Sequence, residues 1–323
     1  MISRQVVNAS LSLLVFFSLA GTASCSSIPE NDGVPQGGTS RESGEHEGGI
    51  ITTRVNKPVP IEQYLISGEQ WKTLTDAEHL LRLRCMERFG VNYQDTQPEK
   101  VAGQSITDYR YGIIDPSYAE RYGYRTPGAR QSKSIEADIK RQDEVYRALP
   151  DSTFLVLYGS TRKESQSKET RSKGRDYAGE KIPQGGCIGE AHRKLYGSWD
   201  GSDAEIADDI NIKSYAASMK DRTVRAAFAK WSSCMNDHGY DYKVPRDADN
   251  DKRWMAERVT AVERETAKVD AECKIKFNVT GIWYGADVAH QEKLIREHSK
   301  ELATIKKTIG ELIARALLEL DRK

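Results

Sequence analysis

Apolar residues recur at intervals of three and four positions in several stretches of the chain, and glycines, prolines and polar clusters separate these stretches. One stretch begins near Ser67 and ends before Gly90, and another follows Asp221 and ends before Gly239. This spacing predicts amphipathic helices, and a glycine just past the last periodic residue is typical of a helix C-terminus. We therefore expect a mainly α fold.

Two further predicted helices each contain a cysteine. One opens at Gly185 and ends near Gly197, and the other starts after Asp251 and carries Cys273. A short helix is expected to start at Asp115, because an aspartate at the cap followed by a proline in the first turn favours helix initiation.

The middle of the chain is less regular. Residues 134–149 are expected to form a polar helix. The apolar run 154–158 fits either a short strand or a buried helical turn, and the charged segment 161–181 fits a hairpin or an exposed loop.

The C-terminal segment has the longest periodic pattern. After Gly281 there is no proline, and apolar residues recur every seven positions at Val288, Ile295, Leu302, Ile309 and Ala316, with Ile305 and Leu312 beside them. This repeat predicts one long C-terminal helix with a coiled-coil-like face, about 60 Å in length. Its rear half either projects and pairs with another protein or a second copy, or folds back as a bundle helix.

The N-terminal segment has the pattern of a bacterial export signal. Arg4 precedes a short apolar run over 11–20, and small residues lead to Cys25. The run is shorter than the about 20 residues that a membrane span needs. We predict a signal peptide over 1–24 and a lipid on Cys25, so the expected partner is the membrane, reached through a lipid anchor.

The segment that follows is predicted to be a flexible tether. Residues 25–58 are rich in glycine, serine and glutamate, and residues 59–323 form the predicted helical domain, with halves of about 59–197 and 198–323. The expected location is the outer face of the cell membrane. Because Thr22 stands where a lipobox usually has leucine, cleavage by ordinary signal peptidase, which would give a secreted protein, is the alternative.

Charge narrows the classes of partner. The chain has 48 Lys and Arg and 48 Asp and Glu, and removal of the signal leaves a slight acidic excess. Nucleic-acid binding usually requires a clear basic surplus, so no nucleic-acid partner is expected.

The cysteines lie in an internal repeat. Cys-Met, a glycine four residues after the methionine and a tyrosine three further on occur at Cys85 and again at Cys234. Lipidation of Cys25 would leave four cysteines, each separated from the next by dozens of residues. In an oxidising compartment we predict one disulfide per half, Cys85–Cys187 and Cys234–Cys273, although four cysteines allow three pairings.

Isolated cysteines also argue against a metal centre, since zinc sites usually bring their ligands in close pairs. No metal and no cofactor are expected. Common catalytic motifs are missing from the sequence, and the calcium-loop-like start at Asp247 lacks the required glycine and glutamate. His238 is expected to interact with the C-terminus of its helix. We therefore predict a non-enzyme; a wall-active hydrolase with two unmarked carboxylates remains the alternative.

The region between residues 109 and 124 is rich in tyrosine. Tyr118, Tyr122 and Tyr124 are the candidate ligand-binding residues, because exposed tyrosines combine a flat apolar face with a hydroxyl group. The alternative is that these rings pack against the helices.

Several short motifs carry a resemblance. They are Cys85-Met86…Gly90, Tyr122-Gly123-Tyr124, Gly185-Gly186-Cys187-x-Gly189-Glu190-Ala191 and Trp231-x-x-Cys234-Met235…Gly239-Tyr240. Together they resemble a group of uncharacterised exported proteins and lipoproteins from actinobacteria. The resemblance implies export and a helical, disulfide-linked fold, and it supplies no catalytic residues.

These observations predict a cell-surface-anchored, non-enzymatic helical protein that acts as a binding or scaffolding module in the bacterial envelope. An envelope protein that contacts the C-terminal helix is the expected partner. The alternative is a binding protein for wall fragments or peptides that uses the tyrosine-rich surface.

Overall fold

The computed structural model describes residues 58–93, 108–127, 132–165, 175–199, 201, 204–256 and 258–322. The predicted signal peptide, Cys25 and all but the last residue of the predicted tether lie outside these ranges. Within them the chain forms twelve α-helices and a single hairpin of two-residue strands. The prediction of a mainly α fold with two disulfides is confirmed.

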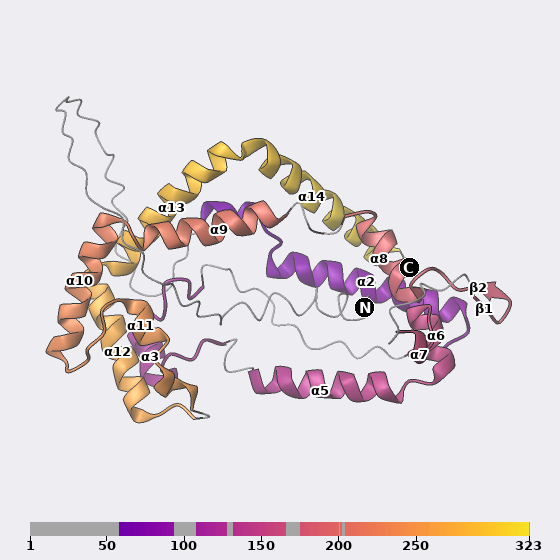
Figure 1. The fold of residues 1–323 in the computed structure, drawn as a ribbon, viewed down its shortest axis with the longest axis horizontal. Coiled ribbons are helices and arrows are strands. Elements are labelled where there is room, and N and C mark those ends of the chain that lie inside the picture. Colours follow the sequence, from indigo (N-terminus) through magenta and orange to yellow (C-terminus); the bar gives the residue numbers. More distant parts are fainter. Residues whose placement is uncertain are drawn as a thin grey trace, which may run out of the picture.

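In chain order the elements are η2 (Pro60–Tyr64, a 3-10 helix), α2 (Gly68–Arg88), α3 (Pro116–Tyr122), α5 (Ser132–Ala148), α6 (Asp151–Tyr158), α7 (Arg162–Ser165), β1 (Asp176–Tyr177), β2 (Glu180–Lys181), α8 (Gly186–Tyr196), α9 (Glu205–Ser218), α10 (Arg222–Asp237), α11 (Pro245–Asp249), η4 (Lys252–Met255, a 3-10 helix), α12 (Ala261–Lys276), α13 (Val279–Glu297) and α14 (Ser299–Asp321). The body is elongated (Figure 1). Helices α3 and α10–α12 form one end, α6–α8 and the hairpin form the other, and α9, α13 and α14 run between them.

The boundaries of α2 and α10 follow the sequence signals closely. The Ser67 side chain accepts a hydrogen bond from the first turn of α2, and Asp221 does the same for α10. Gly90 and Gly239 follow these helices with φ values of +68° and +85°. A residue with a Cβ rarely adopts this left-handed conformation, which explains the glycine in both copies of the repeat.

The buried apolar residues of the described chain form four clusters along the long axis. One lies between α3, α10, α12 and α13, and contains both Trp231 and Trp283. At the other end, Met86 and Leu157 pack where α2, α6 and α8 meet. Between the ends, α14 packs on α2 and α8, and η2 packs on α9, α13 and α14. Segments from both sides of residue 197 therefore share a core.

The predicted C-terminal helix is present but bent. It divides at His298, whose φ of −111° leaves the helical region, into α13 and α14. The two helices meet at the top of the arch in Figure 1. Residues of the predicted apolar face are buried in α14, namely Leu302, Ile305, Ile309, Leu312 and Ala316. This helix folds back on its own chain, so the bundle-helix alternative is the one that the structure supports.

Three local expectations are resolved or corrected. The run 154–158 is helical and belongs to α6, and the segment before Ile182 contains the β1–β2 hairpin. The helix that carries Cys273 does not start after Asp251. Asp251 instead caps η4, and α12 begins ten residues later with Thr260 as its cap. Two capping side chains in succession split what appeared from apolar spacing to be one helix.

Candidate functional site

The two disulfides hold opposite ends of the body. Cys85 on α2 bonds to Cys187 on α8, and Cys234 on α10 bonds to Cys273 on α12. Both bonds join the pairs expected from the sequence, over separations of 102 and 39 residues. Each cysteine pair lies in an apolar cluster, so the two bonds connect helices that already pack together.

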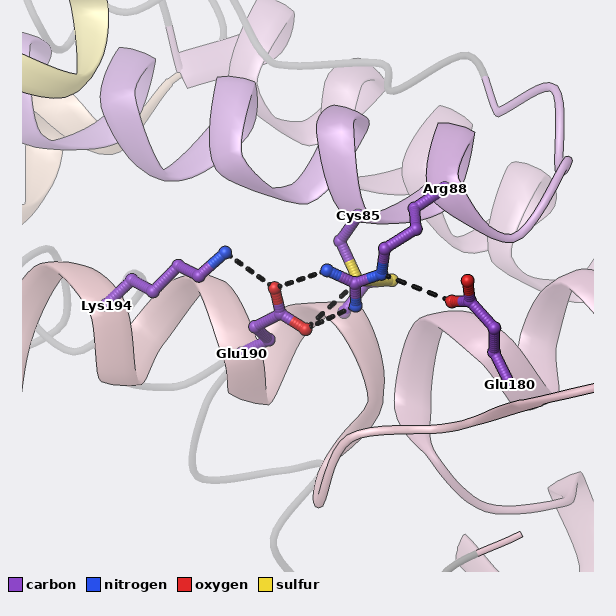
Figure 2. Close-up of a disulfide and its surroundings, with 6 residues drawn as sticks. Cys85, Arg88, Glu180, Glu190 and Lys194 are labelled. Carbon is purple, nitrogen blue, oxygen red and sulfur yellow. Dashed lines mark hydrogen bonds and ion pairs between the residues drawn. A yellow bond between two sulfur atoms is a disulfide. The ribbon is translucent and has the colours of Figure 1, made fainter. Parts of the chain in front are cut away.

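A group of charges covers the Cys85–Cys187 bond (Figure 2). Arg88, one turn after Cys85, donates two hydrogen bonds to the Glu190 carboxylate, at 2.6 and 3.0 Å. Lys194 approaches the same carboxylate at 2.7 Å, and Glu180 lies 3.5 Å from Arg88. The Arg88 hydrogen bonds, together with Lys194, lower the pKa of Glu190 to about 2. Glu190 therefore stays ionised and connects α2 to α8.

The glycines of the Gly-Gly-Cys motif allow a close backbone approach. A Cβ on Gly186 would lie 2.4 Å from the Leu157 carbonyl oxygen, and a Cβ on Gly189 would lie 2.4 Å from that of Gln184. Gly186 also has a φ of +64°. The start of α8 consequently packs directly on the end of α6, and the motif has a structural role here.

The Cys234–Cys273 bond has buried charges beside it. The Trp231 indole donates to Asp270 Oδ1 at 2.8 Å, and Lys274 Nζ donates to Asp270 Oδ2 at 2.8 Å. Lys274 also donates to the Ile113 carbonyl at 3.2 Å, and its Nζ lies 3.8 Å from Asp249 Oδ1. Lys274 and Asp270 are almost completely shielded from solvent.

Burial acts on both members of this pair. Burial raises the pKa of Asp270, and Lys274 only partly opposes the shift. Burial alone would lower the pKa of Lys274, but the carboxylates of Asp249 and Asp270 outweigh it and raise that pKa. The lysine therefore stays charged at neutral pH, and the carboxylates facing it share the compensating negative charge.

A second buried network joins the N-terminal part of the described chain to α13. Asp287 accepts hydrogen bonds from Arg110 Nε at 2.6 Å and from the Tyr111 hydroxyl at 2.9 Å. Gln291 donates to the same carboxylate and accepts from the Ile61 backbone N–H at 3.0 Å. Burial, with Asp287 next in effect, raises the pKa of Tyr111, so this tyrosine remains a neutral hydrogen-bond donor.

The three candidate ligand-binding tyrosines occupy different environments. Tyr124 is buried and stacks on Trp254, with a centroid distance of 5.7 Å. Tyr118 and Tyr122 are half-buried and lie 4.9 Å apart, and the Tyr118 hydroxyl donates to the Arg125 carbonyl. Tyr124 therefore packs in the core, as the alternative in the sequence analysis expected, whereas Tyr118 and Tyr122 remain partly exposed.

Among the described residues, three potential metal ligands come within 4.8 Å of one another: Cys234, His238 and Cys273. Both sulfur atoms belong to the disulfide, and His238 Nδ1 donates to the Cys234 carbonyl at 2.8 Å. His238 thus satisfies a carbonyl at the end of α10, the local role expected from the sequence.

No pattern in the sequence singled out the acidic residues that take part in the interior charge networks, Asp249, Asp270 and Asp287. Charged residues are usually exposed, and the sequence around these three offers no contrary sign. One signal was present: Asp270 and Lys274 are four residues apart on a helix that also carries a cysteine, so one helical face presents both charges.

The described residues thus form a helical body with a disulfide toward each end and paired charges in its interior. No known protein family, curated protein or solved structure matches this chain. Of the helices that the structure describes, none has the length and apolar content to cross a membrane.

Proposed function

We propose that the chain is an exported lipoprotein whose helical body binds and holds another component of the bacterial envelope without catalysing a reaction. The export-signal pattern before Cys25 and the two disulfides support an oxidising location. The interior charges described above contact one another, and this arrangement suits a rigid body better than turnover.

One observation carries the binding role. The end of α14 presents Leu317, Leu318 and Leu320 to solvent, with 54%, 62% and 38% of their surfaces exposed, whereas the rest of its apolar face is buried. Arg84 of α2 holds this end in place through the Glu319 carboxylate and the backbone carbonyls of Glu319 and Arg322. An apolar set on a fixed helix end suits an envelope protein that offers a complementary apolar surface.

A photo-crosslinking residue at position 318 of the full chain tests this role. We expect one dominant envelope protein to be captured from 318 and not from 212, which is a matched control because Ile212 on α9 is 66% exposed. With the purified partner, Leu317→Ser plus Leu318→Ser should weaken binding at least tenfold, or about 1.4 kcal/mol, and Ile212→Ser should not. Equal capture at both positions would contradict the proposal.

The anchor is tested separately. Cys25→Ser should abolish incorporation of a labelled fatty acid and move the protein from the membrane fraction to the medium. A chain that remains unlabelled and is secreted even with Cys25 present would instead support cleavage by ordinary signal peptidase.

A further inference from the structure

Three side chains from two helices converge beneath Gly112. Lys274 and Asp270 come from α12, and Asp249 is the last residue of α11. Lys274 is 1% exposed, with its Nζ 2.8 Å from Asp270 Oδ2 and 3.8 Å from Asp249 Oδ1. The amine therefore lies between two carboxyl groups, of which Asp270 is fully buried and Asp249 has 15% of its side chain exposed.

Gly112 provides the space in which the amine and Asp249 meet. A Cβ at this position would lie 2.6 Å from Lys274 Nζ, and 2.7 and 3.0 Å from the two carboxyl oxygens of Asp249. All three atoms thus lie within 3.0 Å of a single point, which places the amine beside the carboxyl group. Asp249 Oδ1 is buried and accepts no hydrogen bond from any residue that the structure describes. Lys274 Nζ lies 3.8 Å from this oxygen.

We propose that Lys274 and Asp249 condense to form an intramolecular amide bond, with Asp270 relaying the protons. Lys274 is an ammonium ion at equilibrium, and Asp270 takes one of its protons transiently. The nitrogen lone pair that this exposes attacks Cγ of Asp249. A C–N bond forms and one C–O bond of Asp249 breaks. Asp270 delivers both protons released by nitrogen to the departing oxygen, which leaves as water. One ammonium and one carboxylate become one amide and one water, and no oxidant, reductant or other reactant is required.

The surroundings favour this step. The Trp231 indole fixes Asp270 Oδ1, which leaves Oδ2 directed at the lysine nitrogen. Contact between fixed groups removes most of the entropy cost of bringing two reactants together. Because burial raises the pKa of Asp270, this carboxyl accepts a proton readily. Condensation also removes two charges from a site where each is costly to desolvate.

The bond would connect α11 to α12 beside the Cys234–Cys273 disulfide. Such a cross-link survives reduction, which breaks the disulfide. This end of the body would then hold a permanent covalent connection in addition to a reducible one.

Peptide mapping of the purified full chain tests the proposal. After reduction, alkylation and trypsin digestion, an amide at Lys274 blocks cleavage there and joins peptide 247–252 to peptide 269–276. We expect a branched peptide whose mass is that of both peptides less one water, with fragment ions that place the junction at Asp249. Separate peptides of unmodified mass, with cleavage after Lys274, would overturn the proposal.

Variants identify the roles. Asp249→Ala and Asp270→Ala should each eliminate the branched peptide, whereas Asp247→Ala, which removes an exposed carboxylate from the same peptide, should retain it. Circular dichroism checks that each variant is folded. The peptide map of the unaltered chain decides the proposal even if a variant fails to fold. Loss of water confined to peptide 247–252, without joining, would indicate a succinimide and would also overturn the proposal.

Discussion

The two Cys-Met repeats end their helices in the same way, but the charge pairs near them differ in exposure to solvent. Beside Cys85, the Arg88–Glu190 pair lies at the surface, with 41% of the arginine side chain exposed. Beside Cys273, the Lys274–Asp270 pair is sealed in the core. Both ends therefore have a disulfide and a glycine after the helix. Water can solvate the charge pair beside Cys85, but it cannot reach the pair beside Cys273.

This difference shows that the repeat specifies a helix end and a disulfide but not the role of the nearby charges. Removal of one partner of an exposed pair lowers the free energy of unfolding only a little, because water solvates the charge that remains. A buried pair must stay complete, because a single charge left in the core has no solvent to stabilise it. The comparison thus predicts unequal responses to matched substitutions.

Removal of the disulfides should have the largest effect. Cys85→Ser with Cys187→Ser should lower the free energy of unfolding by about 4.7 kcal/mol, and Cys234→Ser with Cys273→Ser by about 4 kcal/mol, because the first bond closes the longer loop. Urea unfolding of each double variant measures both losses. A larger loss at the second end would show that native contacts, rather than loop length, control the difference.

Removal of one buried charge should have the next largest effect. Asp270→Ala leaves the Lys274 ammonium in the core, prevents the proposed amide with Asp249 and leaves the Trp231 indole without its acceptor. We therefore expect a loss of about 3 kcal/mol or more in urea unfolding. Asp209→Ala, which removes an exposed partner of Lys213 at the same i,i+4 spacing, is the matched control and should cost far less. Equal losses would mean that the buried pair has no special role.

The two ends should also differ in their pH dependence. The pKa of Glu190 falls from 4.5 to about 2 in the folded chain, so its stabilising effect is complete above pH 4.5 and is lost as the pH falls toward 2. The pKa of Asp270 is raised in the folded chain, so the stability that this group contributes is present at low pH and is lost as the pH rises. Unfolding of Glu190→Gln should therefore depend less on pH between 4.5 and 2 than unfolding of the unaltered chain. Parallel profiles would contradict this assignment.

Removal of the exposed arginine should have the smallest effect. Arg88→Ala is expected to lower the free energy of unfolding by less than about 1 kcal/mol, because Lys194 still contacts Glu190 and water solvates the remaining charges. Salt titration provides a check, since the difference between Arg88→Ala and the unaltered chain should shrink as ionic strength rises. A loss as large as that of Asp270→Ala would remove the distinction between the two ends.

The sequence predicted the parts of this fold that depend on local rules. Spacing of apolar residues, Asp221 at a cap and Gly90 after a helix each act through neighbouring residues, so they could be recognised without the fold. The interpretation of one disulfide per half also matched the two cysteine pairs, although the sequence alone left three pairings open.

What escaped prediction depends on contacts between distant segments. His298 is neither glycine nor proline, so nothing local marks the bend between α13 and α14. The burial of Asp270 requires Trp231 from another helix, and the burial of Tyr124 requires Trp254. In each case the deciding partner is far along the chain, and a local pattern cannot reveal it.

The position of η2 determines how the body would respond to a mechanical load. Ile61 of η2 is fully buried in the cluster that η2 forms with α9 and α14, and its backbone N–H donates to the Gln291 side chain of α13. A pull on the chain ahead of Pro58 would therefore act first on η2, which noncovalent packing holds in place. Neither disulfide joins η2 to the body, so both bonds would remain intact while η2 separates from α13 and α14.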